Sequence, residues 1–293
     1  MKPLRRRLEE ARQRHNARWE VIERDYMLGW VLAGMQQVTL LRETLVFKGG
    51  TALKKCYFGD YRFSEDLDFS ARGDHPPTAD EMLEAMRQAC TATEALLHAI
   101  APITLRCDPY TERDPHPHGQ QAFIIGARLP WHNERVHTRI MAEITMDEPL
   151  LRPPISRPIL HGYDESLDIS VPVYGLEEII AEKLRAILQF RQQINARGWS
   201  RSRARDYYDL WRILTAYHEE LDLTEFNDLL HRKCRHRGVD FVSEQDFFDE
   251  AVLKTVRSSW EQWLGPLVPD LPPYDQLIED LRPRVEQLID AAA

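Results

Sequence analysis

Cysteine is scarce in this sequence, and its few cysteines are not spaced for a metal site. They are Cys56, Cys90, Cys107 and Cys234. None of them forms a CxxC pair, which argues against a structural zinc site built from cysteines. We therefore predict four buried, reduced thiols that pack as small hydrophobic side chains.

Long apolar runs are lacking as well. No stretch approaches the roughly 18 apolar residues that a membrane-spanning helix needs. Three arginines, Arg5 to Arg7, lie near the N-terminus, but the apolar segment of a secretory signal does not follow them. These absences predict a cytoplasmic protein with no membrane partner, and we expect it to be a monomer.

An excess of basic residues is also missing, since 38 Lys and Arg face 47 Asp and Glu and the formal net charge is -9. This balance argues against a protein that coats nucleic acid without specificity. The basic residues are nevertheless clustered, which is expected of a groove that follows a phosphate backbone. The alternative is a set of solvated helix faces balanced by nearby carboxylates. The main cluster comprises Arg185, Arg191, Arg197, Arg201, Arg203, Arg205 and Arg212.

The chain has 293 residues, of which 43% are hydrophobic, enough for one large domain or two small ones. Apolar spacing predicts helical structure over about 4–44, a further helix at 78–100, and β-type segments at 101–107, 121–129 and 136–146. A proline-rich stretch at 149–158 is the best candidate boundary. After a short strand at 167–173, helices are predicted at 176–195, 203–217, 223–235, 243–263 and 274–291. We therefore predict an α+β domain over 1–155 and a mainly helical domain over 156–293.

A glycine pair interrupts the chain between a short apolar segment at 45–47 and a predicted helix at 51–56. The string is Lys48-Gly49-Gly50-Thr51. Paired glycines permit positive φ and let a ligand approach the backbone. The free N–H groups at the start of a helix suit a phosphate. The Thr51 hydroxyl can either cap the helix or donate to that phosphate.

Two aspartates follow at a spacing of two residues, Asp66 and Asp68, on a strand predicted over 63–70. Residues i and i+2 of a strand point to the same face, so the carboxylates lie side by side. Their mutual repulsion is about 4 kcal/mol at 4 Å and an effective dielectric of 20, and a divalent cation relieves it. Magnesium suits such a pair, because it binds a few carboxylates together with substrate phosphates.

The glycine turn and the acidic pair together have the layout of the polymerase-beta-like nucleotidyltransferases. The strings at 47–53 and 62–69 closely resemble the AbiEii/MenT branch of nucleotidyltransferase toxins. Two further blocks, at 176–186 and 203–210, resemble later motifs of that branch, and the four blocks occur in the family's order. The resemblance implies a nucleotidyltransferase fold with a mixed sheet, followed by an all-helical domain.

The resemblance also implies roles for individual residues. Asp66 and Asp68 match the catalytic, metal-binding pair, and Lys183 matches a catalytic lysine that meets the nucleotide phosphates. Asp206 matches an essential acid, which could orient Lys183, contact the nucleotide or activate the acceptor hydroxyl. The superfamily usually supplies a third carboxylate from a later strand. We expect Glu143 to be this metal ligand, with Asp147 as the alternative.

Other residues are candidates for contact with the nucleotide. Lys48, Gly49, Gly50 and Thr51 form the turn that is expected to hold the β- and γ-phosphates. If the strand begins early enough, Arg62 and Ser64 share the face of the acidic pair. Arg62 would then contact phosphate or brace the carboxylates.

These features predict an enzyme that uses Mg²⁺, or Mn²⁺ in its place, and a nucleoside triphosphate. The resemblance implies a toxin that adds a nucleotide to an RNA, at the 3′ end of tRNA, which blocks translation, and a cognate antitoxin as partner. Two alternatives remain open. The acceptor could be a small molecule or a protein hydroxyl, or the chain could be a non-catalytic nucleotide-binding relative. The hypothesis requires Lys183 and Asp206 to meet Asp66 and Asp68 in one cleft.

Overall fold

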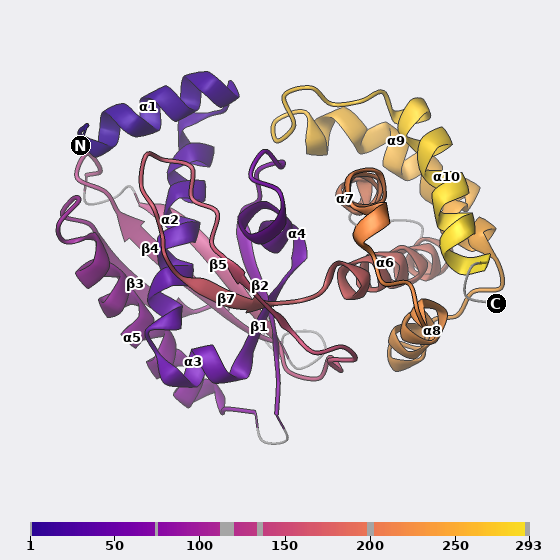
Figure 1. Ribbon diagram of the computed structural model, residues 1–293, viewed down its shortest axis with the longest axis horizontal. Helices are drawn as coiled ribbons and strands as arrows, with labels where there is room; N and C mark the ends of the chain where they lie inside the picture. Colours follow the sequence, from indigo (N-terminus) through magenta and orange to yellow (C-terminus); the bar gives the residue numbers. More distant parts are fainter. Residues whose placement is uncertain (1, 74–75, 112–119, 134–136, 198–201, 291–293) are drawn as a thin grey trace. The chain divides into compact units, whose positions relative to one another are not determined.

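The computed structural model describes residues 2–73, 76–111, 120–133, 137–197 and 202–290. The chain forms two compact units, Met1–Tyr174 and Gly175–Ala293. The first unit is α+β and the second is helical, so the predicted fold class is confirmed. Figure 1 follows the chain through both units in sequence colours.

A seven-stranded mixed sheet lies at the centre of the first unit. Its order is β3-β4-β5-β2-β1-β7-β6, and the pairs β2/β5 and β1/β7 are parallel while the others are antiparallel. The strands are β1 (Leu45–Lys48), β2 (Asp66–Ala71), β3 (Thr104–Pro109), β4 (Gln121–Arg128), β5 (Thr138–Thr145), β6 (Ile155–Pro158) and β7 (Ser170–Val173).

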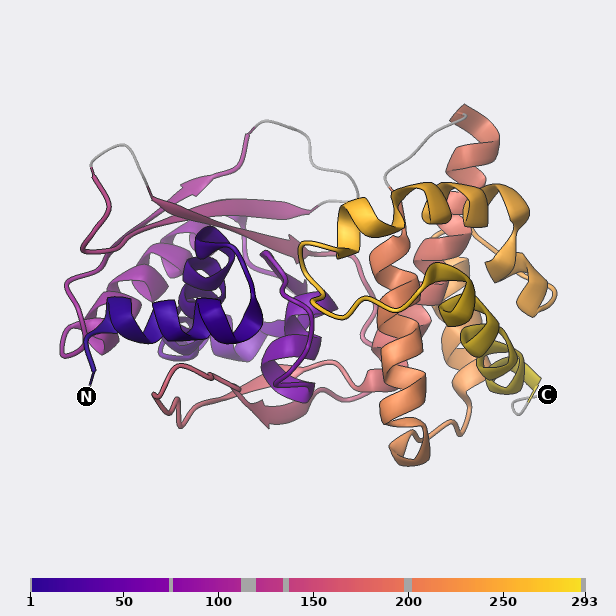
Figure 2. The same cartoon turned by 90° about the horizontal axis from the view of Figure 1, so that it is seen from above.

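Helices cover one face of this sheet. They are α1 (Leu4–His15), α2 (Trp19–Gln36), α3 (Thr39–Thr44) and α5 (Ala79–Leu97). Helix α2 packs on β5, and α5 packs on β3 and on α2. In Figure 2 the indigo and purple helices lie together beneath the pink strands of this sheet. Alternate strand residues such as Leu67, Ala142 and Ile144 point into this layer and are fully buried.

The helical structure predicted over 4–44 is confirmed, and two breaks divide it into three helices. Asn16 ends α1 in the left-handed conformation at φ 46°, and its N–H bonds to the carbonyls of Arg12 and Gln13. Val38 is extended and separates α2 from α3. Asparagine tolerates the left-handed region better than most residues, so this break agrees with its side chain.

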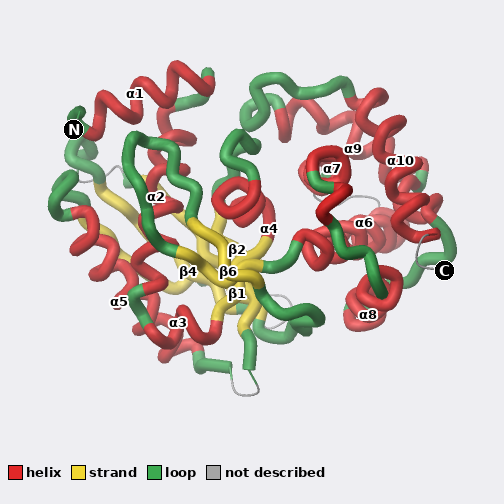
Figure 3. Tube along the Cα trace, in the orientation of Figure 1, coloured by secondary structure: helices red, strands yellow, loops and turns green. Residues whose placement is uncertain are grey.

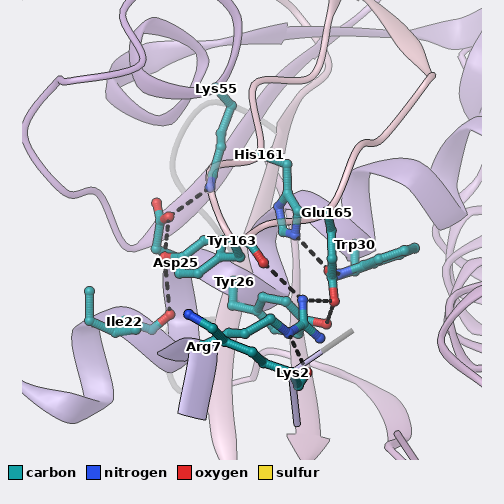
Figure 4. A network of polar contacts seen from close by, with 10 residues as sticks. All are labelled: Lys2, Arg7, Ile22, Asp25, Tyr26, Trp30, Lys55, His161, Tyr163 and Glu165. Carbon is teal, nitrogen blue, oxygen red and sulfur yellow. Dashed lines mark hydrogen bonds and ion pairs between the residues drawn. The ribbon is translucent and has the colours of Figure 1, made fainter. Parts of the chain in front are cut away.

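A buried polar network ties the helices to the segment behind the glycine turn (Figure 4). After β1 the chain forms α4 (Gly49–Ala52) and a π-helical turn, η1 (Leu53–Tyr57). Lys55 of η1 donates to Asp25 of α2 at 2.8 Å, and the Tyr163 hydroxyl donates to the same carboxylate at 2.7 Å. Next to them, Arg7 of α1 pairs with Glu165. The network therefore anchors η1 to the helical layer.

The second unit is built from helices, and Figure 3 draws its described residues as helix and loop only. Helix α6 packs against α7 and α8, and α7 packs against α9 and α10. Two short 3₁₀ segments, η3 (His218–Glu220) and η4 (Glu244–Phe248), lie between them. The helices are α6 (Leu176–Arg197), α7 (Ala204–Ala216), α8 (Phe226–His236), α9 (Glu250–Leu264) and α10 (Tyr274–Asp290).

The helix predicted over 243–263 is also interrupted. Asp249 caps α9 by accepting bonds from the N–H groups of Ala251 and Val252, and this cap separates α9 from η4. Asp is a preferred N-cap because its side chain satisfies the unpaired N–H groups of the first turn.

The two units divide after Tyr174, whereas the sequence placed the boundary at 155/156. The proline-rich segment contains β6, which pairs with β7, and β7 pairs with β1. Residues 156–174 therefore belong to the first unit. All four cysteines are free and buried, as predicted. In the described part of the chain, no helix is both long and apolar enough to span a membrane.

Candidate active site

Three adjacent strands of the first unit place a lysine and two carboxylates in one row. Lys48 at the end of β1 lies opposite Asp68 of β2, and Asp68 lies beside Glu143 of β5. Directly paired residues of neighbouring strands point to the same face of a sheet, so these three side chains share one face. Asp66, two residues before Asp68, points to that face as well.

The register decides between the two candidates for the third carboxylate. Glu143 is the direct neighbour of Asp68 and is half-buried. Asp147 lies two residues beyond the end of β5 and is exposed. The register therefore favours Glu143.

Gly49 lies directly against the Asp68 carboxylate. A Cβ at position 49 would be 2.5 Å from Asp68 Oδ2, and the residue has φ +78°. Both the left-handed backbone and the close approach thus require glycine at this position. The backbone of the turn consequently borders the acidic pair directly.

Gly50 is the contact point for the two other candidate nucleotide-binding side chains. A Cβ at position 50 would lie 2.5 Å from Arg62 Nη2 and 3.3 Å from Ser64 Oγ. The condition for Arg62 and Ser64 to share the strand of the acidic pair is not met, because β2 begins only at Asp66. They reach the turn from the segment before it, and Arg62 is buried there.

The Thr51 hydroxyl has a different partner from the two that the sequence suggested. It donates to the backbone carbonyl of Asp66, and Thr51 is fully buried. The N-cap position of α4 is Lys48, which makes no side-chain cap. Thr51 therefore fastens the glycine turn to the start of β2, where the acidic pair lies.

These residues suit a divalent cation. Asp66 and Asp68 present two carboxylates on one face, and the lack of a side chain at Gly49 lets the backbone of the turn lie against the Asp68 carboxylate. Across the described ranges, no group of three or more His, Cys, Asp and Glu residues is arranged to hold a metal ion. Magnesium commonly uses one or two carboxylates and completes its shell with water and substrate phosphates, so two aspartates suffice.

The second unit brings together the lysine and acid of the later blocks. Lys183 of α6 donates to Asp206 Oδ1 at 3.0 Å and to Asp209 Oδ2 at 2.6 Å, both on α7. Lys183 and Asp209 are buried, and Arg203 Nη1 lies 3.4 Å from the other oxygen of Asp206. Of the three roles considered for Asp206, this geometry supports the orientation of Lys183. The approach of Lys183 and Asp206 to Asp66 and Asp68 stays a prediction.

Several arginines of the main basic cluster are engaged within the second unit. Arg191 pairs with Asp246 at 2.5 Å and with Asp249 at 3.5 Å. Arg205 lies over the Trp263 ring at 5.5 Å. Residue 201 and the side chain of residue 197 lie outside the described residues. These contacts agree with the alternative of helix faces balanced by carboxylates.

Sequence reasoning did not find the whole arrangement. It grouped Lys48 with the phosphate-binding turn, but the register that sets Lys48 opposite Asp68 depends on strand pairing. Asp209 lies three residues after Asp206, and this i, i+3 spacing was the available signal for a second carboxylate on Lys183. The sequence patterns do not identify the part of this sheet face that lies on β3, β4 and β5. The alternation of side chains along these strands was the available signal for it.

Comparisons with known proteins identify the family and the fold. The family model described as "Nucleotidyl transferase AbiEii toxin, Type IV TA system" matches residues 30–291. A search of curated protein sequences finds no match. Among solved structures, the nucleotidyltransferase toxin MenT4 of Mycobacterium tuberculosis is similar at 22% identity and TM-score 0.62, with 93% of this chain and 85% of that chain covered. JHP933 of Helicobacter pylori is similar at 17% identity and TM-score 0.58, with 94% of each chain covered. At these identities the two structures support the fold.

Proposed function

Because this chain belongs to the AbiEii family of nucleotidyltransferase toxins, we propose that it transfers a nucleoside monophosphate from a triphosphate to the 3′ end of tRNA. Membership of a toxin–antitoxin family implies a cognate antitoxin. The observation that carries the proposal is the row of Lys48, Asp68 and Glu143 beside the Gly49-Gly50 turn, with Asp66 on the same face. A nucleotide added to that end would prevent aminoacylation and so block translation.

Asp66 and Asp68, with Glu143 beside them, are the residues that would hold a magnesium ion. When bound, such an ion neutralises charge on the transferred phosphate and aligns the attacking and leaving oxygens. The open backbone of Gly49 and Gly50 gives the triphosphate access to N–H groups at the start of α4. Lys48 and Arg62 add positive charge at the same turn.

Lys183 is proposed to bind the phosphates of the same nucleotide. An ammonium group is a compact cation that suits this task. Asp206 and Asp209 hold its position, because both accept its hydrogen bonds. The acceptor hydroxyl attacks the α-phosphate in line, and pyrophosphate leaves.

The direct test incubates the protein and magnesium with tRNA and each of the four labelled triphosphates in turn. We expect label on the tRNA with at least one triphosphate. Asp68→Asn should lower the rate by about 100-fold or more, because a metal contributes several kcal/mol to the barrier. Asp80→Asn, the same change on the exposed first turn of α5, is the control. Absence of label with all four triphosphates would refute the RNA acceptor.

A metal-free comparison belongs to the same assay. Transfer should stop with excess chelator and return when Mg²⁺ or Mn²⁺ is added. Transfer to a small molecule or to protein, without transfer to RNA, would support the alternative acceptors. An Asp68→Asn variant that keeps its full biological effect would show that the effect does not depend on catalysis.

A further inference from the structure

The face of the sheet that bears the acidic pair continues across β5, β4 and β3. Residues on this side point away from α2 and α5, and Figure 2 shows those helices on the opposite side. Arg106 and Arg139 are exposed, while Ile124 and Met141 are partly exposed. We call this surface the open face and define it by these four residues.

Strand register orders the open face into parallel rows. The first row contains Asp68 and Glu143, and the second contains Asp66 beside Met141, followed by Ile124 of β4 and Asp108 of β3. The third row contains Arg139, Gly126 and Arg106 on β5, β4 and β3. Each row lies two residues from the next, about 6.6 Å by the rise of a strand. The arginines are therefore one row beyond Asp66.

In the third row, two arginines flank a glycine on the neighbouring strand. Arg106 and Arg139 both pair with Gly126, and a Cβ there would be 3.5 Å from Arg106 Nε and 3.1 Å from His137 Cδ2. Burial and the charges of Arg106 and Arg139 lower the pKa of His137, which leaves a neutral ring with one N–H to donate. Asp108 is the nearby counter-charge, 3.7 Å from Arg106, but both side chains are well exposed and such pairs are weak.

A hollow connects this positive row to the acidic pair. It has a volume of about 330 Å³ and is lined by Arg24, Glu65, Asp66, Tyr110, Ile124, Arg139 and Met141. Tyr110 continues β3, because its N–H bonds to the Ala122 carbonyl at 2.9 Å. An aromatic ring with aliphatic neighbours suits a nucleobase, which stacks on such side chains in single-stranded RNA complexes.

We propose that the open face binds the acceptor strand, with the last nucleoside in the hollow by Tyr110 and its 5′ phosphate on Arg106 and Arg139. This inference rests on the proposed function and locates its acceptor within the first unit. The order along the face carries it: the acidic pair, then the hollow with the Tyr110 ring, then the cations. Arginine forks suit phosphate oxygens, and His137 adds a neutral donor. The strand would thus direct its 3′ hydroxyl towards Asp66 and Asp68.

The test measures binding of a short fluorescein-labelled single-stranded RNA to the full chain by anisotropy over a series of salt concentrations. Each phosphate contact contributes about 0.7 to the slope of log affinity against log salt on single strands. The double variant Arg106→Ala/Arg139→Ala should lower the slope by about 1 and weaken binding several-fold at low salt. Arg106→Lys/Arg139→Lys should keep most of the slope, because it keeps the charge.

Arg87→Ala is the matched control, since Arg87 is an exposed arginine on α5, in the helical layer. It should leave the slope unchanged. In the transfer assay, the double alanine variant should raise the KM for tRNA and leave the KM for the triphosphate unchanged. If wild type transfers to tRNA while the double variant keeps the wild-type slope and KM, the inference fails and the proposed function stands. If wild type transfers nothing to RNA, the proposed function fails.

Discussion

At position 49, the backbone and its neighbour both exclude a side chain. The φ of +78° lies in the left-handed region, and the Asp68 carboxylate occupies the place of a Cβ. An L-residue there would be strained by roughly 1–2 kcal/mol and would also displace the carboxylate. One residue thus sets both the shape of the turn and the position of the adjacent aspartate.

We therefore predict that Gly49→Ala lowers nucleotide transfer by roughly 100-fold, because small displacements of reacting groups have effects of this size. Labelled transfer to tRNA under saturating magnesium measures this loss. Gly59→Ala is the control, since a Cβ there meets nothing within 4 Å. A Gly49→Ala enzyme with the wild-type rate would show that the turn does not position Asp68.

At this scale the sequence predicted the residue types well and their partners less well. The glycine, aspartate and lysine residues of the candidate site could be identified from their spacing and from the family resemblance. The partner of Thr51 could not be predicted, because its hydroxyl donates to the backbone carbonyl of Asp66. A backbone acceptor is present at every residue and has no signal in the sequence. Arg62 would share the strand face only if the strand began early enough, and it reaches Gly50 from the segment before β2 instead.

At the scale of elements, α7 positions one side chain of α6, that of Lys183. Asp206 and Asp209 are one turn apart on α7 and both bind the Lys183 ammonium. Asp209 is fully buried, whereas the Asp206 side chain is 17% exposed. The two acids are therefore expected to differ, with Asp209 serving stability and Asp206 facing solvent.

Asp209→Asn should lower the free energy of unfolding by about 1–3 kcal/mol, because a buried charged hydrogen bond is lost. Urea unfolding followed by circular dichroism measures the change. Asp206→Asn should cost less stability, and its loss of transfer should exceed its loss of folded protein. The control Asp228→Asn, on an exposed pair with Arg232, should be nearly neutral. Equal stability losses for Asp206→Asn and Asp209→Asn would contradict this division.

Elements with strong apolar periodicity were predicted close to their observed bounds, as with α5 and α7. The breaks within long helical patterns were missed, since they depend on local caps at Asn16 and Asp249. Strand β6 was also missed, because a short segment among prolines is formed by its partner β7 rather than by its own pattern.

At the scale of the whole molecule, several buried charges make folding depend on pH. Asp25 is buried; burial alone would raise its pKa, but Lys55 and Lys54 lower it from 3.8 to about 2. Burial also lowers the pKa of His161, which is neutral in the folded state. Both shifts mean that the unfolded chain binds more protons in acid, so acidification favours unfolding.

Asp25 contributes stability that is fully present above pH 3.8 and is lost as the pH falls towards 2. The shift corresponds to about 2 kcal/mol at 1.36 kcal/mol per pKa unit. We expect Tm to decline through this window in wild type, after an earlier decline below pH 6.5 from His161. In Asp25→Asn the decline in the lower window should be smaller, since Glu165 and Asp246 also have lowered pKa values, and the variant should be less stable at neutral pH because Lys55 stays buried. A wild-type Tm that is constant between pH 4 and 2 would contradict this assignment.

The α+β class and the helical second half were predictable, because composition, periodicity and four motif blocks agreed. The boundary was not, since β6 and β7 return to a sheet whose first strand lies more than a hundred residues earlier. The convergence of Lys183 on the acidic pair depends on how the two units meet and stays a prediction.

The pairing of β2 with β5 also has a consequence for the order in which the toxin matures during translation. Asp68 leaves the ribosome 75 residues before Glu143, the neighbour that completes its row. A nascent chain that has released only β1 and β2 therefore carries the acidic pair without its flanking strand. The row that contains Asp68 is therefore complete only once β5 has emerged and docked on β2.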